Sequence, residues 1–136
     1  MPAEEREFAD SNIVLYALGK DSHKQQRAWE VLFKRPLISI QVLGECSNTL
    51  IKKHKVDKER VRDILQDILR FTTVEPIDLP IVERAWAVME RYRFAYFDSL
   101  LVATALTADC RKLYSEDLQH GQVIDGRLVV INTFLD

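Results

Sequence analysis

Short apolar segments alternate with longer amphipathic ones along the chain, and this alternation is the strongest constraint on its fold. The apolar segments have the length of strands and predict five of them, at residues 8–9, 37–40, 71–75, 112–115 and 128–131. Helical spacing of apolar side chains predicts helices at residues 12–18, 41–54, 79–92 and 97–108, with two more that begin at the caps Ser22 and Asp57. Strands separated by one or two helices require right-handed parallel crossovers. We therefore expect an α/β fold, a three-layer α/β/α sandwich around a mainly parallel sheet of about five short strands.

The composition fits a single folded domain over residues 1–136. Hydrophobic residues make up 47% of the chain and charged residues 29%, which excludes a disordered protein. The net charge of −2 excludes a protein that coats nucleic acid through bulk positive charge. No apolar stretch approaches the ~20 residues of a membrane span, and residues 1–7 lack the pattern of a secretory signal, so we expect a cytoplasmic protein. Cys46 and Cys110 are expected to be buried thiols rather than zinc ligands.

Four acidic residues are placed to meet at one edge of the predicted sheet. Asp10 follows the first strand and Asp117 follows the fourth. Glu45 lies one turn into the helix after the second strand, and Asp98 lies at the start of the helix of residues 97–108. Because sheets of this kind bind ligands at the carboxyl ends of their strands, we expect the four carboxylates to share one pocket.

Clustered carboxylates repel one another and lose solvation, and a divalent cation removes that penalty. Oxygen ligands suit Mg²⁺ or Mn²⁺, which can lower the pKa of a water molecule and neutralise charge on a phosphodiester during hydrolysis. Each acid also has an ordinary structural interpretation: Asp10 and Asp98 as helix caps, Glu45 as a solvated helix residue and Asp117 as a turn residue. Independent caps and turns give no reason for four acids to gather at one sheet edge, so the pattern favours a metal site.

The segments around these acids resemble those of the PIN-domain nucleases, and in particular the toxin ribonucleases of VapBC-type toxin–antitoxin pairs. The similarity covers nearly the whole chain and rests on residues 10–16, which begin Asp10-Ser11-Asn12, on Leu43-Gly44-Glu45, on residues 97–105, which begin Phe97-Asp98, and on Ser115-Glu116-Asp117. It implies that one or two Mg²⁺ or Mn²⁺ ions are bound by the catalytic acids Asp10, Glu45, Asp98 and Asp117. It also implies that carboxylates or metal-bound water are oriented by Ser11, Asn12, Ser115 and Glu116.

Two features depart from the family pattern, and a third leaves one of its residues unassigned. Ser11 replaces the usual Thr and keeps its hydroxyl, and the acidic residues 4–7 make the first strand more polar than the family's. Glu116 beside Asp117 leaves the identity of the fourth ligand open.

The resemblance further implies a metal-dependent endoribonuclease that acts as a growth-restraining toxin. It implies a small antitoxin protein that covers the acidic site and a homodimer of the toxin itself. Two alternatives stay open: a non-catalytic RNA-binding relative, and a phosphate-accepting regulatory α/β domain. The second would need a lysine at the end of the fifth strand, where the chain reads Ile131-Asn132-Thr133. DNA also stays open as a substrate.

Positive charge is densest at the carboxyl-terminal end of the helix of residues 41–54 and just beyond it. Its candidates for binding an RNA backbone are Lys52, Lys53, Lys55 and Arg60. A solvated helix end, whose cations complement the helix dipole, explains the same residues and is favoured. Trp29 and Trp86 lie on amphipathic faces and are expected in the core. The chain has no glycine-rich phosphate loop and no nucleophile-elbow serine, which excludes nucleotide kinases and serine hydrolases.

Overall fold

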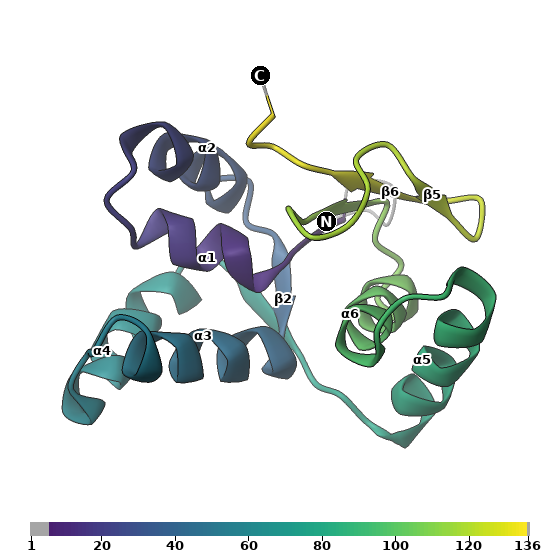
Figure 1. Cartoon of the computed structure of the whole chain (residues 1–136), viewed down its shortest axis with the longest axis horizontal. Helices are drawn as coiled ribbons and strands as arrows, with labels where there is room; N and C mark the ends of the chain where they lie inside the picture. Colours follow the sequence, from purple (N-terminus) through teal and green to yellow (C-terminus); the bar gives the residue numbers. More distant parts are fainter. Residues whose placement is uncertain (1–5, 136) are drawn as a thin grey trace.

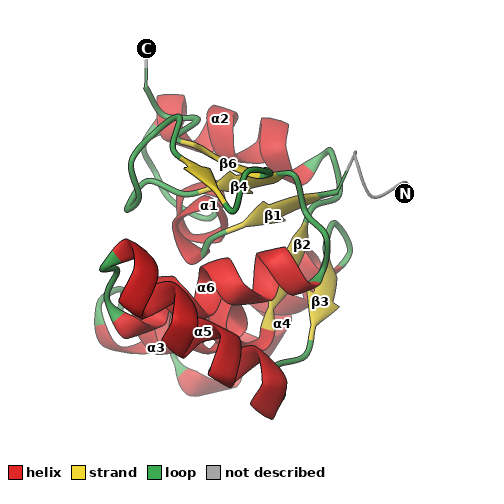
Figure 2. Cartoon of the chain, turned by 90° about the vertical axis from the view of Figure 1, so that its right-hand side faces the viewer, coloured by secondary structure: helices red, strands yellow, loops and turns green. Residues whose placement is uncertain are grey.

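The computed structural model describes residues 6–135, which form a six-stranded sheet with helices on both faces (Figure 1). The strands are β1 (Glu7–Ala9), β2 (Leu37–Ser39), β3 (Thr73–Glu75), β4 (Lys112–Tyr114), β5 (Val123–Ile124) and β6 (Leu128–Ile131). The helices are α1 (Ser11–Ala17), α2 (Ser22–Leu32), α3 (Ile40–Lys52), α4 (Lys58–Leu69), α5 (Leu79–Tyr92) and α6 (Tyr96–Thr107). Figure 2 shows the short strands of the sheet between the helical layers, which confirms the predicted α/β/α fold.

The order of the strands determines where a ligand can bind. The order is β3-β2-β1-β4-β6-β5, and every neighbouring pair is parallel except β5 with β6. From β1 the chain runs outward to β2 and β3 through α1–α4, and then returns through α5 and α6 to β4 on the other side of β1. Right-handed crossovers in opposite directions place their helices on opposite faces. In Figure 1, α1–α4 lie to the left of β2, whereas α5 and α6 lie to its right and below β5 and β6. The direction reverses between β1 and β4, and the carboxyl ends of these two strands are the position at which open α/β sheets bind ligands.

The sheet has one strand more than the sequence predicted. Strand β5 pairs antiparallel with β6, with Val123 opposite Val129. Asp125, Gly126 and Arg127 form the turn between them, and the first two have φ angles of +52° and +70°. Two residues are too few to show a strand pattern, but the Asp-Gly pair is a strong hairpin signal that sequence reasoning missed.

The structure differs from the prediction at two helix caps. Asp21, not Ser22, caps α2, because its carboxylate accepts a hydrogen bond from the backbone N–H of Lys24 at 3.2 Å. The prediction was wrong by one position, since Asp and Ser are equally favoured as caps. Asp57 does precede α4 as predicted, but its side chain makes no capping hydrogen bond.

Helix α6 is the most buried helix of the fold and carries much of its core. All of its residues from Ser99 to Leu106 are buried, so it has no solvent-exposed stripe. It packs against α5 on one side and the sheet on the other, and Leu101 is 1% exposed. The thiols of Cys46 and Cys110 are also buried, as predicted. The start of α6, and Asp98 with it, is therefore held in a fixed position next to the sheet.

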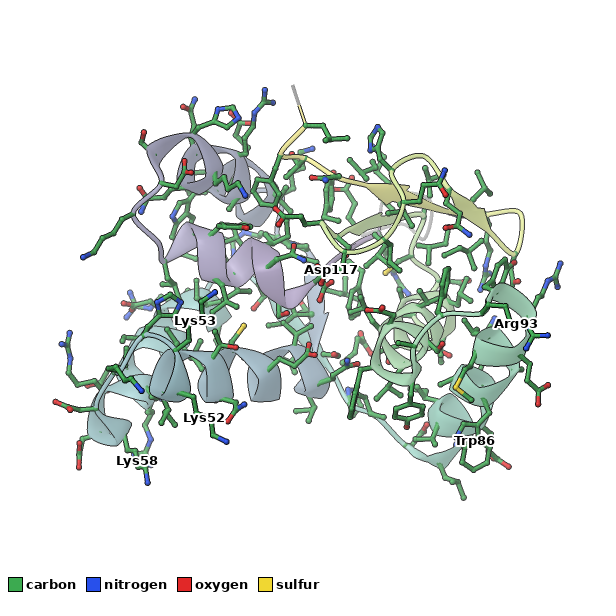
Figure 3. All side chains as sticks on the ribbon, viewed as in Figure 1. Lys52, Lys53, Lys58, Trp86, Arg93 and Asp117 are labelled. Carbon is green, nitrogen blue, oxygen red and sulfur yellow. The ribbon has the colours of Figure 1, made fainter. Side chains whose placement is uncertain are left out.

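The two tryptophans differ in their surroundings. Trp29 packs against Phe71, with ring centroids 5.1 Å apart, and its indole N–H donates to the carbonyl oxygen of Ala17. Trp86 is 49% exposed and lies on the outer side of α5 (Figure 3), so its predicted place in the core is wrong. The buried face of α5 is narrower than the sequence suggested and includes Ala85, the neighbour of Trp86.

Residues 1–5 lie outside the described part of the chain, and with them half of the polar segment of residues 4–7. Within residues 6–135, none of the helices combines the length and the apolar character that crossing a membrane requires.

Candidate active site

Asp10 is the most buried charged residue of the acidic cluster. It directly follows β1 and is the N-cap of α1, so the structural interpretation of this residue is confirmed. Its Oδ1 accepts a hydrogen bond from the backbone N–H of Ser11 at 2.6 Å, and its Oδ2 accepts one from the Ser115 hydroxyl at 2.7 Å. Only 4% of the residue is exposed. The carboxylate is therefore fixed between the ends of β1 and β4.

Three further carboxylates come from other elements. Glu45 lies on α3, Asp98 lies in the first turn of α6, and Asp117 follows β4. Burial raises the pKa of Asp10 from 3.8 to about 6; the negative charges of Asp117 and Asp98 add to this effect, and the bonds from Ser115 and Ser11 oppose it. Three of the four acids predicted from the sequence, Asp10, Asp98 and Asp117, thus interact electrostatically although they come from distant segments of the chain.

Glu45 and Asp98 respond to the same environment. The pKa of Glu45 is raised by burial and by the charges of Asp10 and Asp98, while hydrogen bonds from Gln41 and Ser11 oppose the rise. The pKa of Asp98 is raised by burial and by the charge of Asp117. Each of the four acids is therefore linked electrostatically to at least one other.

Asn12 and Ser115 connect Asp10 to Asp117. The amide nitrogen of Asn12 lies 3.4 Å from Asp10 Oδ2 and 3.5 Å from Asp117 Oδ2, within hydrogen-bond distance of both. Ser115 donates to Asp10 through its hydroxyl and accepts from the backbone N–H of Asp117 at 3.2 Å. These two polar side chains hold the carboxylates of β1 and β4 in a common orientation.

The side chain of Glu116 faces a different group of residues. Its Oε1 accepts a hydrogen bond from the Tyr16 hydroxyl at 2.9 Å, and its Oε2 lies 3.3 Å from the ammonium of Lys24. The same ammonium lies 4.2 Å from the centre of the Tyr16 ring. Because Glu116 is engaged with α1 and α2, Asp117 is the acid of this pair that faces Asp10. Sequence reasoning missed Tyr16 and Lys24, since nothing in their spacing relates them to residue 116.

The fit of a metal ion rests on the donor chemistry of this cluster. In the described part of the chain, no three Asp, Glu, His or Cys side chains are close enough to hold an ion directly. Two buried side-chain oxygens of the described residues lack a hydrogen-bond donor, Asn12 Oδ1 and Gln41 Oε1. The carboxylate oxygens of the cluster suit a hydrated Mg²⁺ or Mn²⁺ ion, which retains several of its waters. The residues present therefore fit a hydrated ion.

The predicted basic residues do not form one surface. Lys53 lies between α1 and α3, whereas Lys52 projects from the opposite side of α3 (Figure 3). Lys53 lines a groove of about 360 Å³ together with Asn12 and Asp117. A second groove of about 410 Å³ is lined by Glu45, Gln41 and apolar residues that include Ile40, Phe97 and Leu100.

The protein is thus an α/β/α sandwich domain with a cluster of carboxylates at the point where the strand order reverses. Residues 8–124 match the family model of the PIN domain, and the chain belongs to this family. This result speaks against a phosphate-accepting regulatory domain.

Solved structures with the same fold include VapC toxins. The protein in a toxin–antitoxin complex from Klebsiella pneumoniae has a TM-score of 0.71 and 22% identity, with coverage of 93% of this chain and 97% of that one. VapC20 of Mycobacterium tuberculosis, a sarcin-ricin loop cleaving toxin, has a TM-score of 0.65 and 17% identity, with coverage of 82% and 89%. VapBC2 of Rickettsia felis, bound to a DNA fragment from its promoter, has a TM-score of 0.67 and 17% identity, with coverage of 91% and 97%. At these identities the likeness is one of fold. A comparison with curated protein sequences gives no match.

Proposed function

We propose that this protein is a metal-dependent endoribonuclease that hydrolyses RNA phosphodiester bonds, with Asp10, Glu45, Asp98 and Asp117 around the metal. The observation that carries the proposal is the burial of Asp10 at the strand-order reversal, in electrostatic contact with acids from two other segments. Bringing carboxylates together and burying one of them costs stability, and a bound cation would offset this cost. Membership of the PIN family is consistent with a nuclease.

The roles of the residues follow from their contacts. A bound Mg²⁺ or Mn²⁺ ion would lower the pKa of a water molecule and neutralise charge on the phosphodiester. Ser11 and Ser115 hold the Asp10 carboxylate through its two oxygens, so this ligand is fixed before any ion arrives. Asn12 connects Asp10 to Asp117 and would keep their oxygens aimed at the same centre.

We further propose that the protein is the toxin of a toxin–antitoxin pair and acts in the cytoplasm as a homodimer. Support comes from structural neighbours in the Klebsiella pneumoniae toxin–antitoxin complex and in VapBC2 of Rickettsia felis. A small antitoxin would block the acidic site, and a guanidinium group placed among the carboxylates would form strong charge-assisted hydrogen bonds there.

Cleavage of total RNA and tRNA by the purified protein tests the nuclease proposal. We expect cleavage with Mg²⁺ or Mn²⁺ and none with excess chelator. Asp10→Asn and Asp98→Asn should abolish it, whereas Glu30→Gln, which removes an exposed carboxylate on α2, should not. Cleavage by folded Asp10→Asn protein in chelator would show that another group or a contaminant cuts the RNA.

The toxin role has a separate test in growing cells. Induced expression of the wild-type chain should arrest growth, and expression of Asp10→Asn at the same level should not. Equal growth arrest by both would remove the link between the acidic site and toxicity.

A further inference from the structure

The groove that contains Asp117 continues along α1 to a group of positive charges. One side of α1 lines the groove with Asn12, Leu15 and Tyr16, and Gly19 lines it just after the helix ends. Lys53 and His54 line it from the end of α3, and Lys20 lines it from the connection between α1 and α2. Figure 3 shows Asp117 and Lys53 near opposite ends of α1. The groove therefore joins the acidic cluster to a basic end.

The length of α1 sets the distance between these two ends. Its seven residues span about 10 Å at about 1.5 Å per residue. A cation at the far end therefore does not reach a phosphate that is held at Asp10 and Asp117, but it can contact another phosphate of the same strand. The volume of about 360 Å³ lies in the ~300–1,000 Å³ range of ligand sites.

The charges of the groove are paired in a way that leaves its two lysines available. The carboxylate of Asp21 caps α2, and that of Glu116 is paired with Lys24. Lys20 and Lys53 form no ion pair with any residue from 6 to 135. Of the acids that line the groove, Glu116 is thus paired with Lys24, and Asp21 and Asp117 form no ion pair with Lys20 or Lys53.

A polyanion needs such cations at this site. The acidic cluster repels the phosphates on either side of the one that is cleaved, and the chain as a whole has a net charge of −2. Binding of RNA therefore depends on local positive charge close to the acids.

We propose that the α1 groove is a binding site for the RNA backbone, in which Lys20 and Lys53 contact a phosphate at a distance from the scissile one. This inference rests on the proposed function and selects Lys53 from the basic residues that the sequence suggested. Lys52, on the opposite side of α3, lies outside this site. Phosphate contacts of this kind position an RNA strand without reading its bases.

Fluorescence anisotropy with a labelled single-stranded RNA tests the site in protein that carries Asp10→Asn and does not cleave. Lys20→Gln and Lys53→Gln should each weaken RNA binding about 3-fold, and the double substitution about 10-fold, as expected for exposed ion pairs. Each should also lower the slope of log affinity against log salt by about 0.7. Lys52→Gln, which removes the same charge from the same helix, is the matched control and should change neither quantity.

Two results would overturn the inference. RNA affinity that is unchanged in the double variant, or lowered equally by Lys52→Gln, would show that the groove is not the binding site. A groove that binds protein instead would give the first of these results. Cleavage by the wild-type enzyme tests the proposed function separately. If the wild type cleaves RNA and Lys20→Gln and Lys53→Gln leave its KM unchanged, only the inference about the groove is overturned. Absence of cleavage by the wild type overturns both.

Discussion

Replacing Asp10 by Asn should stabilise the metal-free protein at neutral pH while removing its activity. Burial is the largest cause of the rise in the pKa of Asp10 from 3.8 to about 6, and at about 1.36 kcal/mol per pKa unit this rise corresponds to a cost of about 3 kcal/mol for the charged form. Asn removes the charge but accepts one hydrogen bond fewer from Ser11 or Ser115, a loss of about 1 kcal/mol. We therefore expect a net gain of about 2 kcal/mol. For 136 residues this corresponds to a rise in Tm of about 6–10 °C.

The pH dependence gives the sign of the effect. Between pH 3.8 and about 6 the folded state binds more protons at Asp10 than the unfolded state does, so the stability of the wild type falls as the pH rises through this window. The gain from Asp10→Asn should be complete above about pH 7, and below about pH 4 it should give way to a loss of about 1 kcal/mol, because the charge cost has vanished and only the lost hydrogen bond remains. Thermal unfolding of both proteins in excess chelator, at several pH values, measures it.

Added metal should reverse the order of stability. Mg²⁺ or Mn²⁺ should raise the Tm of the wild type, because an ion that binds only the folded state stabilises it, and should raise the Tm of Asp10→Asn much less. Glu30→Gln serves as the control for removal of an exposed carboxylate and should follow the wild type throughout. A destabilised Asp10→Asn protein at pH 7.5 in chelator, or a gain that does not change with pH, would refute the reasoning about burial.

Three further predictions concern the site and the core. Asp98→Asn should lower the rate of cleavage at saturating Mn²⁺ by at least about 100-fold, more than the ~10–100-fold that loss of a residue behind a ligand costs; a smaller loss would remove Asp98 from the metal site. Asp117→Asn should lower cleavage far more than Glu116→Gln, whose lost ion pair with the partly exposed Lys24 should cost at most about 1 kcal/mol in urea unfolding; the reverse order of activities would make Glu116 the fourth acid. Leu101→Ala should destabilise the fold by about 2–5 kcal/mol in urea unfolding, because Leu101 is 1% exposed, and a loss below 1 kcal/mol would contradict its place in the core.

The sequence predicted the layers of the fold because the type of each element and the order of the elements can both be recognised from local stretches of the chain. Periodicity marks amphipathic helices such as α5, length distinguishes the uniformly apolar α6 from the short strands, and the parallel crossovers follow from the order of these elements. The hairpin of β5 and β6 was missed because its two-residue strand carries no period. Trp86 was misplaced because a hydrophobic residue next to a buried stripe does not reveal how wide that stripe is.

The sequence by itself determined which residues are acidic, on which elements they lie and at which end of a strand or helix each stands. These properties depend on local order along the chain, and they suffice to predict four carboxylates at one edge of the sheet. Only the tertiary structure decided that Asp117 faces Asp10 while Glu116 pairs with Lys24, and that Lys53 faces the groove while Lys52 projects away from it. Neighbouring residues leave the backbone in different directions, so which of two adjacent side chains meets a distant partner depends on how the elements pack.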